Sequence, residues 1–78
     1  MKKADQEALL LKLHGTPNGK PIVFPPLLPA LSTEPLQAVI IERDEEADFW
    51  HLQLYWLSVP VGKVTAQLFQ GQLLLEVL

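Results

Sequence analysis

The stretch that decides the fold is WHLQLYW at residues 50–56, followed after a turn by KVTAQL at residues 63–68. Both stretches alternate apolar and polar residues, so every second side chain lies on the same face. This alternation is typical of β-strands that bury one face of a sheet. It predicts one shared apolar layer, formed by Trp50, Leu52, Leu54, Trp56, Val64, Ala66 and Leu68.

The residues around this stretch extend the sheet in both directions. Residues 36–43 are mostly apolar and predict a strand, and residues 72–78 predict a last strand after a tight turn at Gln70 and Gly71. Residues 58–62 contain a proline and a glycine, so they are predicted to be the turn between the two alternating strands. Short connections favour an antiparallel β-meander of about four strands.

The first residues predict a helix over residues 3–14. Leu9, Leu10 and Leu13 share one stripe of this helix, Asp5 is placed to cap its first turn, and Gly15 stands where a helix ends. A helix of about three turns needs packing to persist. We therefore expect the leucine stripe to lie against the sheet.

Residues 16–35 form a proline-rich segment that holds all of the seven prolines except Pro60. Ile22 to Phe24 can form a short strand, which Pro25 and Pro26 would end because proline cannot donate to a β-ladder. The segment is also rich in leucine, whereas flexible linkers are polar. We interpret it as an ordered strap over the sheet, with a mobile arm as the alternative.

Length and composition bound the remaining possibilities. Seventy-eight residues form one domain, divided into a helix (1–15), a strap (16–35) and a β-sheet core (36–78), which is an α+β fold. A net charge of −3 without a basic stripe argues against nucleic-acid binding. The apolar runs are too short to cross a bilayer and no secretory signal is visible, so we expect a cytoplasmic protein. The apolar last strand suggests that another subunit covers it, or that the chain is part of a longer protein.

The side chains capable of chemistry form no catalytic or metal-binding pattern. The acidic residues lack the glycine and the spacing of a calcium loop, and are interpreted as a solvated hairpin turn; they are Glu42, Asp44, Glu45, Glu46 and Asp48. His14 and His51 are isolated and predicted to be surface residues. There is no cysteine and no glycine-rich phosphate loop. The sequence therefore predicts a non-enzymatic protein without metal or cofactor.

Four segments together resemble a known family. They read IIERDEE (40–46), WHLQL (50–54), VPVGKVTAQL (59–68) and GQLLLEV (71–77). In this order they resemble the C-terminal domain of flagellar hook-length control proteins, which is similar to the substrate-specificity switch domain of type III secretion needle-length regulators. In that family a helix usually follows the last strand, which offers one way to cover it.

The resemblance implies a protein-binding function. Such a domain contacts the type III export gate and switches it between substrates, in a parent protein that can itself be exported. The family's turn motif falls on Val61, Gly62 and Val64, with Pro60 as an approximate match, so these residues are the expected partner contacts. The alternative is a structural or peptide-binding β-domain that homo-oligomerises through its last strand, with Leu74 and Leu78 at the edge.

Overall fold

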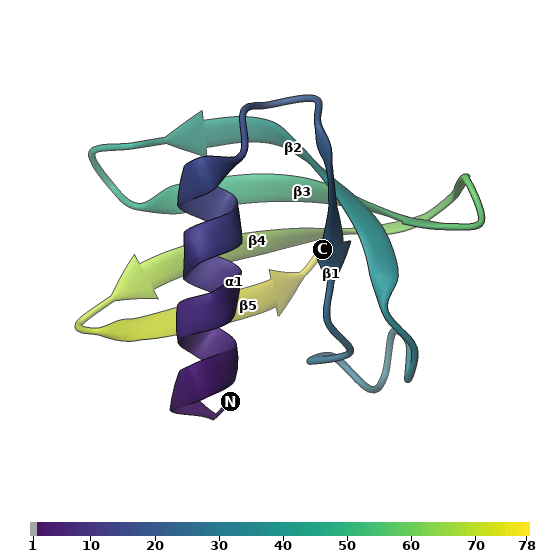
Figure 1. Cartoon of the computed structure of the whole chain (residues 1–78), viewed down its shortest axis with the longest axis horizontal. Coiled ribbons are helices and arrows are strands. Elements are labelled where there is room, and N and C mark those ends of the chain that lie inside the picture. Colours follow the sequence, from purple (N-terminus) through teal and green to yellow (C-terminus); the bar gives the residue numbers. More distant parts are fainter. Residues whose placement is uncertain (1) are drawn as a thin grey trace.

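The computed structural model describes residues 2–78, which form one helix and one antiparallel sheet (Figure 1). The elements in chain order are α1 (Lys3–Gly15), β1 (Pro21–Phe24), β2 (Leu36–Asp44), β3 (Phe49–Trp56), β4 (Val59–Phe69) and β5 (Gln72–Val77). Neighbouring strands in the sequence are neighbours in the sheet. The predicted α+β meander is confirmed, with five strands instead of about four, because the short segment at β1 pairs with β2.

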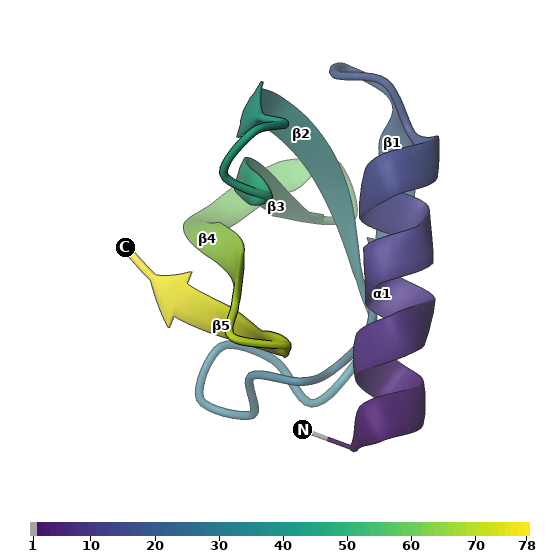
Figure 2. The ribbon, with the colours of Figure 1, turned by 90° about the vertical axis from the view of Figure 1, so that its left-hand side faces the viewer.

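Helix α1 covers one face of the sheet, which we call the inner face (Figure 2). Leu9 and Leu13 of α1 are fully buried against it, as the leucine stripe predicts. The inner face carries alternate residues of every strand, and its buried members are Phe24, Leu36, Ala38, Ile40, Trp50, Leu52, Leu54, Val64, Ala66 and Leu73. The outer face carries the intervening residues, including His51, Gln53 and Tyr55.

The proline-rich segment lies against the sheet. Its first part is strand β1, whose Phe24 is buried in the core. Leu27, Leu28 and Leu31 then pack against the same core. The strap and the helix therefore both contribute side chains to the core on the inner face.

The C-terminal end of α1 is held by Arg43 from β2. The Arg43 guanidinium donates hydrogen bonds to the carbonyl oxygens of Leu13 and Thr16, and to Oδ1 of Asn18 at 2.8 Å. A β-bulge at Ile41 shifts the register, so Arg43 stands opposite Trp50 and lies on the inner face. A cation that satisfies the last carbonyls of a helix also interacts favourably with its dipole.

The other end of α1 is fixed by Gln6 and not by the expected cap. The predicted Asp5 cap is wrong: Lys2 occupies the N-cap position and makes no side-chain capping bond. The Gln6 amide instead donates to the carbonyl of Gly71 at 2.9 Å and accepts from the N–H of Leu73 at 3.1 Å. This pair of bonds ties the first turns of α1 to the start of β5.

Candidate protein-binding surface

The residues expected to contact a partner lie at the start of β4, just after its hairpin with β3. The predicted turn at residues 58–62 is wrong, because the connection is the two-residue turn Leu57–Ser58 and β4 begins at Val59. Pro60 is part of the strand and stands opposite Tyr55, next to a bulge that leaves Val61 unpaired. A bulge interrupts the ladder of hydrogen bonds, which is why a proline is tolerated there.

The four expected contact residues differ in accessibility. Pro60 and Val61 are exposed, and Gly62 is half-buried beneath the strap. A Cβ atom at Gly62 would lie 3.4 Å from Cδ1 of Leu31, which is ordinary packing distance. Val64 is 0% exposed, so it supports β4 from the core and offers no surface to a partner.

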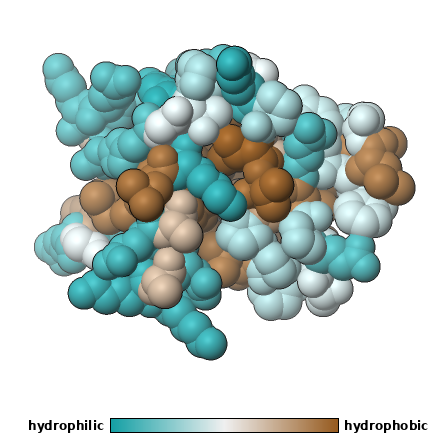
Figure 3. Space-filling view, viewed as in Figure 1, coloured by the Kyte–Doolittle hydropathy of each residue, from teal (hydrophilic) through white to brown (hydrophobic). Residues whose placement is uncertain are grey.

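Exposed apolar side chains gather around this hairpin. We call them the hairpin patch, which consists of Trp56, Leu57, Val59 and Val61. In the space-filling view, a cluster of brown apolar atoms lies among paler ones at the right-hand end, over the β3–β4 hairpin of Figure 1 (Figure 3). The prediction that Trp56 belongs to the core is wrong, since its exposed fraction is 41%. Trp56 lies at the end of its strand, beyond the cover that the helix and strap provide.

The turn at the centre of the patch has an unfavourable backbone for its residues. Leu57 and Ser58 have φ angles of 48° and 68°, in the left-handed region. Two-residue hairpin turns of this kind strongly prefer Asn-Gly, because a larger side chain is strained there. Leu57 is also 78% exposed. Leu57 therefore contributes little to packing within the domain.

An open groove of about 360 Å³ adjoins the hairpin patch. It is lined by Trp56 and Val61 of the hairpin patch, by residues 31–34 of the strap and by Leu36. Ser32 orders this part of the strap, because its hydroxyl oxygen accepts a bond from the Glu34 N–H at 3.0 Å. The groove therefore joins apolar side chains of the hairpin patch to a strap segment that includes the polar residues Ser32, Thr33 and Glu34.

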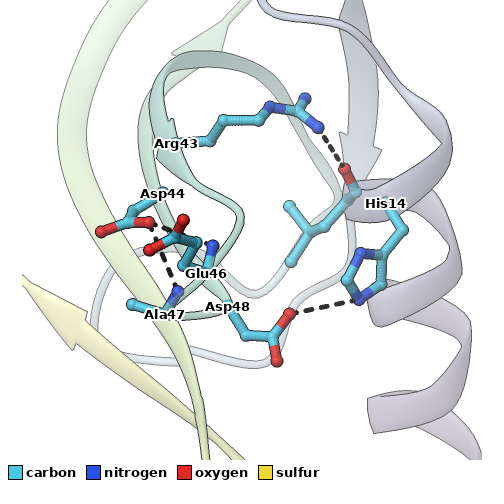
Figure 4. A network of polar contacts seen from close by, with 7 residues as sticks. His14, Arg43, Asp44, Glu46, Ala47 and Asp48 are labelled. Carbon is cyan, nitrogen blue, oxygen red and sulfur yellow. Dashed lines mark hydrogen bonds and ion pairs between the residues drawn. The ribbon is translucent and has the colours of Figure 1, made fainter.

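Three of the acidic residues, Glu45, Glu46 and Asp48, lie in the β2–β3 turn as expected, whereas Glu42 and Asp44 belong to strand β2. Oδ1 of Asp44 accepts hydrogen bonds from the backbone N–H groups of Glu46 at 3.1 Å and Ala47 at 3.3 Å. Asp48 faces α1, where its Oδ1 lies 3.9 Å from Nε2 of His14 (Figure 4). Within residues 2–78 no three side chains come together as metal ligands.

His51 on the outer face is less exposed than predicted. Its side chain is 22% exposed, with Nδ1 lying 3.9 Å from Oε2 of Glu42. Its Nε2 is buried and has no hydrogen-bond partner within the described part of the chain. The neighbouring outer-face side chains of Gln53 and Tyr55 are also half-buried. The outer face is thus packed closely enough to shield a histidine without a covering element.

Strand β5 is one of the two edge strands of the sheet, and both residues expected at its edge are exposed. Leu74 points to the outer face and Leu78 follows the end of the strand. On the inner face Leu73 is buried and Leu75 is packed against the core. Only one face of this strand is therefore covered by the domain itself.

Comparison with protein families, with curated proteins and with solved structures found no match to this chain. In the described residues, the helix is too short and too polar to span a membrane.

Proposed function

We propose that this chain is a non-enzymatic protein-interaction domain that binds its partner through the hairpin patch. The observation that carries the proposal is the strained and exposed Leu57, flanked by Trp56 and Val59. Exposed apolar clusters on small domains commonly mark interaction sites, and tryptophan is enriched among the residues that dominate binding.

The partner we propose is a component of the type III export gate, met in the cytoplasm. Of the three residues on which the motif of the hook-length control family falls, Val61 is exposed and belongs to the hairpin patch, and Pro60, the approximate match, is exposed beside it. The resemblance and the exposed apolar surface therefore share Val61, which supports this hairpin as the contact. In this proposal the domain acts in hook or needle length control by switching the substrate specificity of the gate.

Calorimetric titration with the purified cytoplasmic domain of the export-gate component from the same organism tests this proposal. Leu57→Asp places a charge in the hairpin patch and should weaken binding at least tenfold, or about 1.4 kcal/mol. Leu11→Asp is the matched control, because Leu11 on α1 is 74% exposed and lies outside the patch. Equal affinities of the two variants, or no binding by the unmodified chain, would reject the proposal.

Self-association through β5 is the second candidate function. It is favoured by the outermost position of β5 and by the exposure of Leu74 and Leu78, since an apolar sheet edge promotes pairing with another chain. Light scattering across a hundredfold dilution tests it. A mass that falls from dimer to monomer supports this candidate, and a monomer at every concentration rejects it.

A further inference from the structure

The free edge of β5 presents a short, defined set of backbone groups. In an antiparallel ladder, alternate residues direct their N–H and C=O groups to opposite sides of the strand. The N–H of Leu78 donates to the carbonyl of Lys63, so residues 74, 76 and 78 bond to β4. Leu73 has the opposite direction, as its N–H donates to Gln6. By the same alternation, the N–H and C=O groups of Leu75 and Val77 point away from the sheet.

Gln6 limits where a new strand can pair with this edge. Its amide bonds to Gly71 and Leu73 in the manner of a neighbouring strand, so the first part of the edge is already occupied. Leu75 and Val77 receive no backbone partner among residues 2–78. The available edge therefore consists of these two residues, with Glu76 between them.

Charge disfavours a second copy of β5 as the occupant. An antiparallel copy that uses both free residues sets Leu75 opposite Val77 of the copy, and therefore sets Glu76 opposite its own counterpart. Like charges directly opposite each other destabilise a strand pair. A register centred on Leu75 would instead need the N–H of Leu73, which Gln6 holds.

The side chains along the edge define the complementary strand. Glu76 stands opposite Thr65 on the outer face, is exposed, and forms no ion pair within the described residues. Leu75 and Val77 lie on the inner face, where apolar neighbours are favourable. A cation opposite Glu76, between two apolar residues, would match both faces.

We propose that the edge of β5 at Leu75 and Val77 binds an extended segment of a partner protein with an apolar–basic–apolar sequence, its Lys or Arg opposite Glu76. Such strand addition obtains affinity from main-chain hydrogen bonds and selectivity from alternate side chains. The inference rests on the proposed function, because it takes the partner to be a protein. The bond between Leu78 and Lys63 places this edge next to Gly62, so one partner can contact both the edge and the hairpin patch.

The probe is the peptide acetyl-Thr-Val-Lys-Val-Thr-amide, titrated at millimolar concentration and followed by the backbone amide resonances of the ¹⁵N-labelled chain. We expect the Leu75 and Val77 resonances to shift. The same peptide with Glu in place of Lys should bind at least tenfold more weakly, and Glu76→Lys should reverse this preference. Equal binding of both peptides, or no binding of the Lys peptide, would overturn the inference.

A matched pair of variants isolates the backbone contribution. Val77→Pro removes an N–H that points away from β4, so the fold should persist while peptide binding is lost. Val77→Thr keeps the N–H and should bind as the unmodified chain does. Loss of peptide binding in both variants would contradict the main-chain mechanism. A concentration-dependent dimer in which the Leu75 and Val77 amides are protected from exchange would instead assign the edge to a second copy of the chain and overturn the inference. Leu57→Asp should leave peptide binding unchanged, which separates this inference from the hairpin proposal.

Discussion

The two tryptophans of β3 lie on the same face of the same strand, yet only one belongs to the core. Trp50 is 3% exposed, and the ring of His14 contacts it edge-on with 5.0 Å between the ring centres. Trp56 is 41% exposed and borders the open groove. Alternation along a strand determines which face a side chain takes, whereas burial depends on whether another element reaches that position.

The turns at the two ends of β3 also differ in how far other parts of the domain hold them. The β2–β3 turn is closed by the Asp44 carboxylate and linked to α1 through Asp48. The β3–β4 turn holds Leu57 and Ser58 in the left-handed region, with no side-chain bond that closes it among the described contacts. Asp48 in the first turn also has a left-handed φ, of 47°, so the two ends differ in side-chain closure and in apolar exposure. We interpret this contrast as the difference between a structural end and a binding end.

The largest expected effect is on the stability contributed by the two tryptophans. Trp50→Ala should lower the free energy of unfolding by about 3–5 kcal/mol, because it removes a buried aromatic side chain and leaves a cavity. Trp56→Ala should cost less than about 1.5 kcal/mol, since much of that ring already contacts water. Urea denaturation of both variants measures the difference. Similar losses would mean that the two ends of β3 are equally packed.

The next largest effect is expected when the contacts of Arg43 with the C-terminal end of α1 are removed. Arg43→Ala removes the guanidinium bonds to Leu13, Thr16 and Asn18, and should destabilise the domain by about 1.5–3 kcal/mol. Arg43→Lys is the control, because it keeps the charge but cannot donate in several fixed directions. It should recover only part of the loss. A full recovery would show that charge alone holds the helix end.

Much of the fold could be predicted from the sequence, because its determinants are local and periodic. The alternation of residues 50–56 and 63–68 identified the sheet and its buried face, and the leucine stripe identified the packed side of the helix. Gly71 identified the last tight turn, where its φ is 77°. Each of these signals lies within a few consecutive residues, so it can be recognised without knowing the three-dimensional structure.

The errors arose where distant residues decide the structure. Pro60 was expected in a turn, but it lies in β4 beside a bulge that exists only through pairing with β3. The roles of Gln6 and Arg43 depend on partners far away along the chain, and neither has a local signal. Leu57 was missed as a site residue for the same reason. Its significance comes from the φ angle of a turn whose position the sequence did not reveal.

A smaller effect is expected when strain is removed from the binding end. Replacing Leu57 and Ser58 together with Asn-Gly should raise the free energy of unfolding by about 1 kcal/mol, because these residues favour the left-handed turn. The same change should weaken binding to the export-gate domain. Thermal unfolding and calorimetric titration measure the two effects. A variant that is more stable and binds equally well would contradict a functional reason for the strained leucine.

The smallest effect is expected at the acidic turn. Alanine at both Glu45 and Glu46 should change stability by less than about 0.5 kcal/mol, because both side chains are exposed and outside the closing bonds. Calcium should not raise the melting temperature of the unmodified chain or of the double alanine variant. A large calcium-dependent rise would overturn the interpretation of this turn as purely structural, since tight binding stabilises the folded state.

The most direct test of the central claim uses the two tryptophans as reporters in one sample. Incorporation of 5-fluorotryptophan gives separate ¹⁹F signals for Trp50 and Trp56, and the unlabelled export-gate domain adds none. In the free chain, only Trp56 should show a solvent isotope shift between H₂O and D₂O. On addition of the partner domain, the Trp56 signal should move and lose that shift, while the Trp50 signal stays unchanged. A Trp56 signal that the partner leaves unaltered, or a Trp50 signal that responds equally, would contradict the assignment of the β3–β4 end as the binding surface.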